Sequence, residues 1–145
     1  MPAYFDSSVL LSILKREPDG ERASSLWNAH NNRVSSILFE IECLTVLKRP
    51  STPSGSKFPA IWLSQVQKAL SEFLKAIILK PVDDAIVGII RSETYFSQAR
   101  SLDAIHVATA LYFKSHLSET FHFITFDDRM ARVARSVGLE VLGRD

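Results

Sequence analysis

Four acidic residues have the type and surroundings to form a catalytic site: Asp6, Glu42, Asp103 and Asp127. Carboxylates that gather in one pocket repel each other and stay ionised at neutral pH only if a cation neutralises them. Oxygen ligands suit Mg²⁺ or Mn²⁺ rather than zinc. A carboxylate-bound ion of this kind can hydrolyse phosphodiesters, because it lowers the pKa of a bound water and stabilises the leaving oxygen.

Each acid also has a purely structural interpretation. Asp103 could be a first-turn acid that the helix dipole favours. Glu42 could be a solvated helix residue, as could Glu40 two positions earlier. Either Asp127 or Asp128 could cap the helix that follows. The spacing of the acids therefore does not by itself decide between a metal site and separate structural roles.

Short apolar runs and helical periodicities alternate along the chain, and this alternation predicts the fold. Strands are expected over 3–6, 33–36, 76–82, 121–128 and 139–142. Helices are expected after Ser7 or Ser8, over 21–30, after 36, and over 60–75, 83–97, 101–114 and 128–137, with Gly138 ending the last one. This order is typical of an α/β domain, a three-layer α/β/α sandwich with a mainly parallel sheet of about five strands.

The predicted strands explain why a carboxylate follows the apolar opening "MPAYF". A buried unpaired charge is costly unless it is paired or holds a metal. In parallel sheets, however, sites form beyond the carboxyl ends of the strands. Asp6 and Asp127 both fall at such ends, so each can face a crevice although its strand is buried.

Composition sets broad limits. The 145 residues suggest one domain over 1–145, with an ordinary globular composition of 46% hydrophobic and 23% charged residues. The formal net charge of +1 argues neither for nor against nucleic acid. The single cysteine, Cys43, excludes a disulfide framework and a cysteine zinc site. The start of the chain does not resemble a signal peptide and no apolar run reaches a membrane span, so we expect a cytoplasmic protein.

Four segments, in this order, resemble the PIN-domain ribonucleases, and within them the VapC-type toxins of toxin–antitoxin pairs. They are "YFDSSVLLSIL" (4–14), "VSSILFEIECLTVLKR" (34–49), "RSLDAIHVATAL" (100–111) and "FITFDDRMARVARSVGLEVL" (123–142). The "LDAIHVATA" stretch is the most specific of them. The second segment aligns Glu42, rather than Glu40, with the family's acid, and the fourth aligns Asp127.

The resemblance implies an acidic metal site of Asp6, Glu42, Asp103 and Asp127, supported by the hydroxyl of Ser8 and, less directly, of Thr125. It also implies endonucleolytic cleavage of tRNA, rRNA or mRNA with Mg²⁺ or Mn²⁺. In our mechanistic hypothesis, in-line attack by a water with the 3′-oxygen as leaving group would give a 5′-phosphate and a 3′-hydroxyl. A cognate antitoxin and a homodimer are further expectations. Residues 49–63 match nothing in the family, and Asp128 beside Asp127 leaves the fourth ligand open.

Other residues have competing interpretations. His106 could be a general base, although a packed histidine is the commoner case. The cations Arg129, Arg132, Arg135, Lys48, Arg49 and Lys57 could meet phosphates or be solvated. The aromatic residues Trp27, Phe58 and Trp62 could stack on bases, although packing in the core or a dimer is the expectation.

Three alternative functions stay open. One is a haloacid-dehalogenase-like phosphatase with Asp6 as its nucleophile, although such enzymes place a second acid where this chain has Ser8. Another is a PIN-like module that binds RNA or protein without cutting. The third is a DNA-directed nuclease of the same fold.

Overall fold

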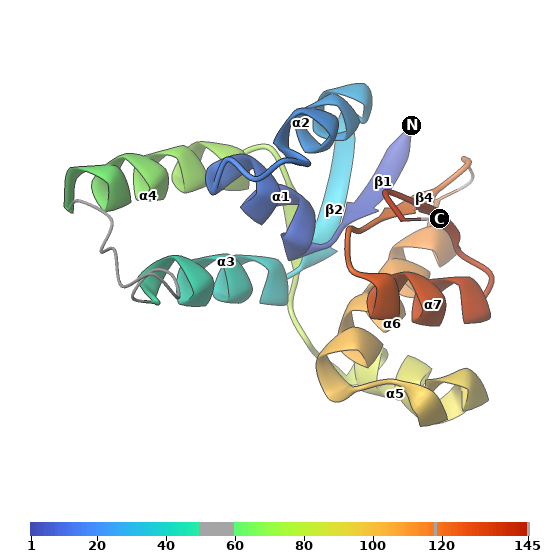
Figure 1. Ribbon diagram of the computed structural model, residues 1–145. Coiled ribbons are helices and arrows are strands. Elements are labelled where there is room, and N and C mark those ends of the chain that lie inside the picture. The colour runs from blue at the N-terminus through green and yellow to red at the C-terminus, as the bar shows by residue number, and fades with distance from the viewer. Residues whose placement is uncertain (50–59, 118, 145) are drawn as a thin grey trace.

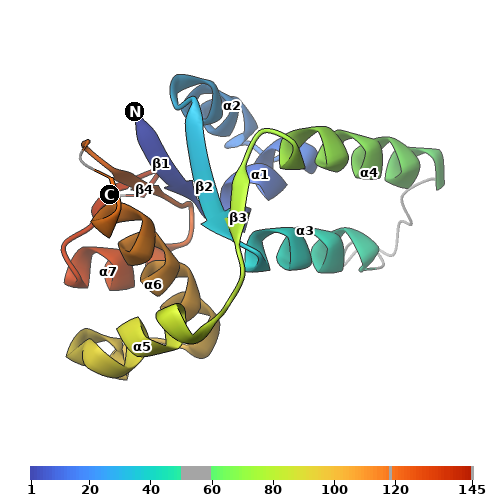
Figure 2. The same ribbon diagram turned by 180° about the vertical axis from the view of Figure 1, so that it is seen from behind.

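The computed structural model describes residues 1–49, 60–117 and 119–144, with only the backbone of 60–62. Its centre is a sheet of five parallel strands in the order β3-β2-β1-β4-β5 (Figures 1 and 2). The strands are β1 (Pro2–Phe5), β2 (Asn32–Ser36), β3 (Ile78–Lys80), β4 (His122–Ile124) and β5 (Glu140–Leu142). The predicted α/β class with a parallel five-stranded sheet is confirmed.

Helices cover both faces of the sheet, as the prediction required (Figure 1). One face carries α1 (Ser7–Leu14), α2 (Gly20–Ala29), α3 (Leu38–Lys48) and α4 (Ala60–Leu74). The other carries α5 (Asp84–Ser92), the 3₁₀ turn η1 (Thr94–Gln98), α6 (Ser101–Ser115) and α7 (Asp128–Ser136). Parallel strands need such crossover connections, and the helices bury the two faces of the sheet.

The first strand lies in the middle of the sheet and is buried on both sides. Ala3 and Phe5 belong to the core against α1–α4, whereas Tyr4 belongs to the core against α5–α7. This division follows from the two-residue period of a strand. Asp6 is therefore on the same side of the chain as Tyr4, a relation that becomes important at the site.

The helix predicted over 83–97 is divided in two. Glu93 has an extended backbone (φ −100°, ψ 111°), which ends α5 and begins the 3₁₀ turn. The Ser92 hydroxyl donates a hydrogen bond to the Ile89 carbonyl oxygen at 3.1 Å. The same carbonyl also accepts the Glu93 N–H at 3.1 Å, so the serine adds a hydrogen bond to the last turn of the helix. Serine side chains that bond the backbone in this way are typical of helix ends.

The structure also shows where several other residues singled out in the sequence lie. Trp27 is only 5% exposed and packs on Phe5, so its core role is confirmed. Gly138 follows α7 with φ +84°, and Cys43 is buried. Phe58, Lys57 and the side chain of Trp62 lie outside the described residues. Within those residues, no helix is both long and apolar enough to cross a membrane.

Candidate active site

Asp6 is positioned by the end of β1 and the start of α1. Its backbone N–H donates to the Ile124 carbonyl at 3.0 Å, which continues the β1–β4 pairing by one residue. The residue is 3% exposed. Buried carboxylates require hydrogen bonds or a cation, and Asp6 has the first of these from neighbouring hydroxyls.

Two hydroxyl groups hold one oxygen of Asp6. Ser8 donates to Oδ2 at 2.7 Å, and Thr125 donates to the same atom at 2.8 Å. Ser8 Oγ in turn accepts the Phe126 N–H at 3.0 Å, and Thr125 Oγ1 accepts the Asp127 N–H at 3.0 Å. The two residues expected to support the site therefore join Asp6 to the segment that carries Asp127.

Asp127 and Asp128 have different surroundings. Asp127 is the N-cap of α7, and its Oδ1 accepts the Met130 N–H at 3.0 Å. It lines the same cavity as Asp6, which Asp128 does not. The Asp128 carboxylate lies 3.5 Å from Arg144 Nε and is 76% exposed. The placement favours Asp127 over Asp128 as the fourth acid.

Asp103 has a carboxylate oxygen without a hydrogen-bond partner among the described residues. It lies in the first turn of α6, and this oxygen is its buried Oδ2. Burial, followed by the charges of Asp127 and Asp6, raises the pKa of Asp103 above its ordinary value. A buried carboxylate oxygen without a partner, beside other carboxylates, fits a site for a cation.

Glu42 reaches the site from α3 and contacts a histidine. Its Oε1 lies 2.5 Å from His106 Nε2 and accepts the Ser7 hydroxyl at 3.3 Å. His106 Nδ1 in turn lies 2.5 Å from the Tyr4 hydroxyl. Burial opposes the charged imidazolium, but the Glu42 hydrogen bond and nearby carboxylates raise the pKa of His106 overall.

The sequence prediction did not include Tyr4 and Ser7. Ser7 lies between two predicted site residues, and Tyr4 precedes Asp6 by two positions. Residues two apart on a strand share a face. That alternation is the signal that points from Asp6 to Tyr4, although it does not reveal His106 as the partner.

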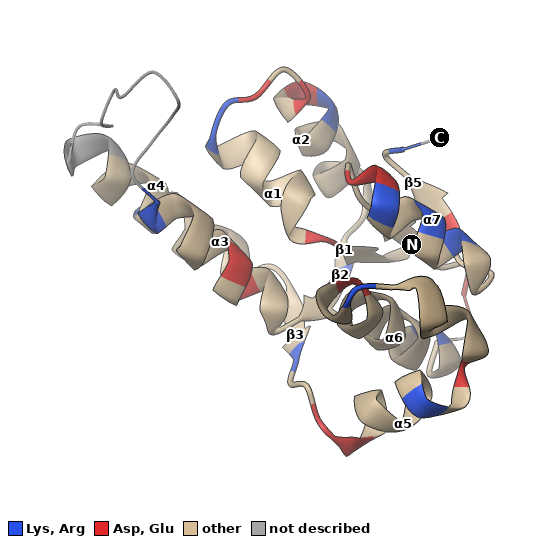
Figure 3. Cartoon of the chain, turned by 60° about the horizontal axis from the view of Figure 1, so that its bottom comes forward, with Lys and Arg blue, Asp and Glu red and all other residues tan. Residues whose placement is uncertain are grey.

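All four predicted acids line one cavity of about 450 Å³ at the carboxyl edge of the sheet. They come from the start of α1, from α3, from the start of α6 and from the start of α7, where Figure 3 shows acidic segments. Arg100 and Arg129 also line the cavity. Of the three arginines predicted at three-residue spacing on α7, only Arg129 is among these lining residues.

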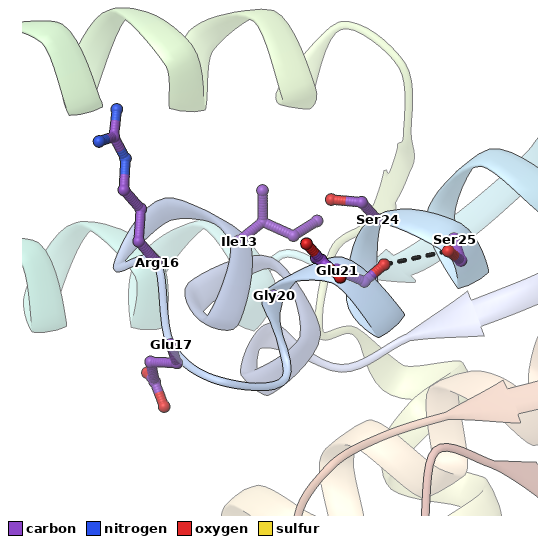
Figure 4. Close-up of a pocket in the computed structure, with 7 residues that line it drawn as sticks. All are labelled: Ile13, Arg16, Glu17, Gly20, Glu21, Ser24 and Ser25. Carbon is purple, nitrogen blue, oxygen red and sulfur yellow. Dashed lines mark hydrogen bonds between the residues drawn. The ribbon is translucent and has the colours of Figure 1, made fainter.

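A second, larger hollow lies between α1 and α2 and has different chemistry. It measures about 530 Å³ and is lined by Ile13, Arg16, Glu17, Gly20, Glu21, Ser24 and Ser25. In Figure 4 the side chains of Arg16 and Glu17 point in opposite directions, and Ser25 bonds a backbone carbonyl. Because no charged groups converge there, size alone does not make it the candidate site.

The residues present fit a hard divalent cation. Asp6, Glu42 and His106 each offer an atom within 4.8 Å of the others, and Asp103 adds the unpartnered oxygen. Three of these four donors are carboxylates, which Mg²⁺ and Mn²⁺ prefer. The nitrogen that His106 offers is already bonded to Glu42, so the oxygens are the better ligands.

Comparison with known families identifies the fold. The family model described as PIN domain matches residues 3–136, and the chain belongs to this family. Two ribonucleases of Mycobacterium tuberculosis are each 28% identical to it. Ribonuclease VapC46 (strain H37Rv) aligns over 96% of this chain and 95% of its own length, and Ribonuclease VapC47 (strain CDC 1551) over 93% and 91%.

Solved structures agree in fold. VapBC2 from Rickettsia felis, bound to a promoter DNA fragment, superposes with a TM-score of 0.65 at 15% identity over 98% of both chains. FitAcB from Neisseria gonorrhoeae superposes with a TM-score of 0.67 at 19% identity over 97% and 96%. The resemblance to VapC-type PIN ribonucleases is confirmed, and the phosphatase alternative loses its basis.

Proposed function

We propose that this protein is a metal-dependent endoribonuclease and the toxin of a toxin–antitoxin pair. The observation that carries the metal dependence is the orphaned, buried Oδ2 of Asp103 in a cavity that three other carboxylates line. Family membership and the two relatives named as ribonucleases support the reaction class. The enzyme would be a single PIN domain over 1–145 and act in the cytoplasm.

The four carboxylates Asp6, Glu42, Asp103 and Asp127 would hold Mg²⁺ or Mn²⁺. When bound, the ion supplies a water of lowered pKa and positive charge for the oxygen that leaves. The protein fixes the ligands beforehand, because Ser8 and Thr125 both hold Asp6 Oδ2. The Asp127 Oδ1 is fixed in turn by the Met130 N–H.

The substrate would be RNA, whether tRNA, rRNA or mRNA. Arg100 and Arg129 line the acidic cavity, where their charges can meet phosphates on either side of the scissile bond. Hydrolysis with the 3′-oxygen as leaving group gives a 5′-phosphate and a 3′-hydroxyl. His106 does not suit the role of general base, because its side chain is fully buried.

An antitoxin would bind beside the cavity. A groove of about 280 Å³ adjoins it and is lined by apolar side chains that include Ile41 and Leu102, together with Ser7, Glu42, Thr45 and Arg49. Ile41 and Leu102 are 49% and 50% exposed. A partner segment with apolar side chains for the groove and a basic side chain for the acids would complement both surfaces. The nuclease would also form a homodimer.

The first experiment is cleavage of a mixed tRNA and rRNA substrate by purified protein, in Mn²⁺ and in EDTA, with Asp103→Asn in parallel. We expect metal-dependent cutting that the variant lacks. Cutting that persists in EDTA, or in the variant, would contradict the proposal. A DNA substrate of the same length tests the alternative of a DNA-directed nuclease, and absence of both metal binding and cutting would favour a binding module.

A further inference from the structure

Glu42 differs from the other acids of the site in how its side chain is held. Asp6 is fixed by two hydroxyls and Asp127 by a backbone N–H. Glu42 is on α3, is 27% exposed, and its shortest hydrogen bond is the one to His106. A glutamate side chain has more rotatable bonds than an aspartate and loses more entropy when it is fixed. A rigid partner is therefore needed to aim it.

His106 is that partner and is itself held on both ring nitrogens. The ring is fully buried in α6, one turn after Asp103. The Ser36 N–H donates to the Tyr4 oxygen at 3.2 Å, so the Tyr4 hydroxyl proton is free to point at His106 Nδ1, 2.5 Å away. Because the Glu42 carboxylate can only accept, Nε2 carries a proton and donates it to Glu42 Oε1, whether the ring is neutral or charged.

We propose that Tyr4 and His106 are positioning residues that orient the Glu42 carboxylate toward the metal site. The chain from the Ser36 backbone through Tyr4 and His106 to Glu42 fixes the imidazole tautomer and the ring orientation. This inference rests on the proposed metal centre. It assigns His106 neither as a ligand nor as a base, because its Nε2 is occupied by Glu42 and the ring is closed to solvent.

Two substitutions of His106 separate these roles. In His106→Gln the terminal amide replaces Nε2 and keeps a donor for Glu42. In His106→Asn the shorter amide can still meet Tyr4 but does not reach Glu42. We expect Mn²⁺ affinity, measured by titration calorimetry on the metal-free protein, to fall less than about 5-fold in His106→Gln and about 10–100-fold in His106→Asn.

The matched control is His30→Asn. His30 is also a buried histidine, 5% exposed, with both ring nitrogens engaged, but it lies at the opposite edge of the sheet. It should lower the melting temperature and leave Mn²⁺ affinity unchanged. Tyr4→Phe removes only one hydroxyl and keeps the core filled. It should weaken Mn²⁺ binding about 3–10-fold and decides the case if His106→Asn does not fold.

Each outcome has a distinct meaning. Equal Mn²⁺ affinity in wild type, His106→Asn and Tyr4→Phe would overturn the positioning role while leaving the proposed nuclease intact. Equal and severe loss in both His106 variants would overturn it in favour of His106 as a direct ligand. A wild-type protein that binds no Mn²⁺ would overturn the metal centre, and this inference with it.

Discussion

Two histidine–glutamate pairs lie at opposite edges of the same sheet. At the carboxyl edge, His106 and Glu42 are 2.5 Å apart, with side chains 0% and 27% exposed. At the amino edge, His122 begins β4, Glu140 begins β5, and the pair is 3.3 Å apart with side chains 12% and 64% exposed. The residue types are the same, but their surroundings differ.

The surroundings decide which pair can do chemistry. Glu42, which His106 contacts, lines a cavity with three further carboxylates, one of which has an oxygen without a partner among the described residues. His122 and Glu140 instead continue a hydrogen-bonded chain to His30, whose Nδ1 lies 2.8 Å from the Leu26 carbonyl. Each ring nitrogen of His30 and His122 already has a partner, so this chain offers no free nitrogen to a ligand. The excess of negative charge at the carboxyl edge instead favours a bound cation.

The largest expected effect comes from neutralising the acids at the carboxyl edge. Asp6→Asn and Asp103→Asn should each reduce RNA cleavage about 100-fold or more, since losing a ligand exceeds the usual cost of losing a group that orients one. Their stabilities should diverge. Asp6→Asn should destabilise the metal-free protein by about 1–3 kcal/mol, because the hydrogen bonds from Ser8 and Thr125 are weaker to a neutral amide oxygen than to a carboxylate.

Asp103→Asn should instead stabilise the metal-free protein by about 0.5–2 kcal/mol, because it removes a charge that the site repels. Urea unfolding in EDTA measures both differences. Equal stability losses in the two variants would show that the Asp103 carboxylate is not strained in the absence of metal.

A smaller effect should come from the backbone that supports the site. Gly143 has φ +101°, and a Cβ there would overlap the carbonyl oxygen of Thr125. Gly143→Ala should therefore cost about 1–3 kcal/mol of stability and, by shifting Thr125, reduce cleavage about 10-fold. Gly88→Ala, inside α5 with open space around it, is the control and should add about 0.5–1 kcal/mol. An unchanged cleavage rate in Gly143→Ala would separate Thr125 from the site.

The pH dependence of stability should give a further test of the carboxyl edge, through Asp103. The folded-state pKa of Asp103 is raised from 3.8, mainly by burial, so the folded state binds its proton more tightly than the unfolded state. Stability from this group is then present at low pH and is lost as pH rises from about 4 through the raised pKa. Urea unfolding of metal-free protein should show this slope, and Asp103→Asn should reduce it. A slope that Asp103→Asn leaves unchanged would contradict this assignment.

The sequence was sufficient to place the strands, because β1, β3, β4 and β5 lie in short apolar runs. The exception is β2, whose sequence NRVSS has one apolar residue and was placed by the helix cap that follows it. Asp6 and Asp127 could be predicted because each follows an apolar run. Glu42 needed the resemblance, because α3 is apolar around both Glu40 and Glu42. The Tyr4–His106 contact joins residues 102 positions apart, so no local pattern indicates it. The break at Glu93 was missed because the apolar period continues through it, although Ser92, whose hydroxyl bonds the Ile89 carbonyl, is a residue type common at helix ends.

The smallest effect is expected at the amino edge. Glu140→Gln removes one charge from a pair whose carboxylate is mostly exposed, and exposed ion pairs contribute only about 0–1 kcal/mol. Unfolding should therefore shift by no more than this, and neither Mn²⁺ affinity nor RNA cleavage should change. Glu42→Gln, the same substitution beside His106, should abolish both, which makes the two variants a matched pair. If Glu140→Gln also weakened Mn²⁺ binding, the two edges would be coupled through the sheet, and the surroundings of Glu42 alone would not explain the site.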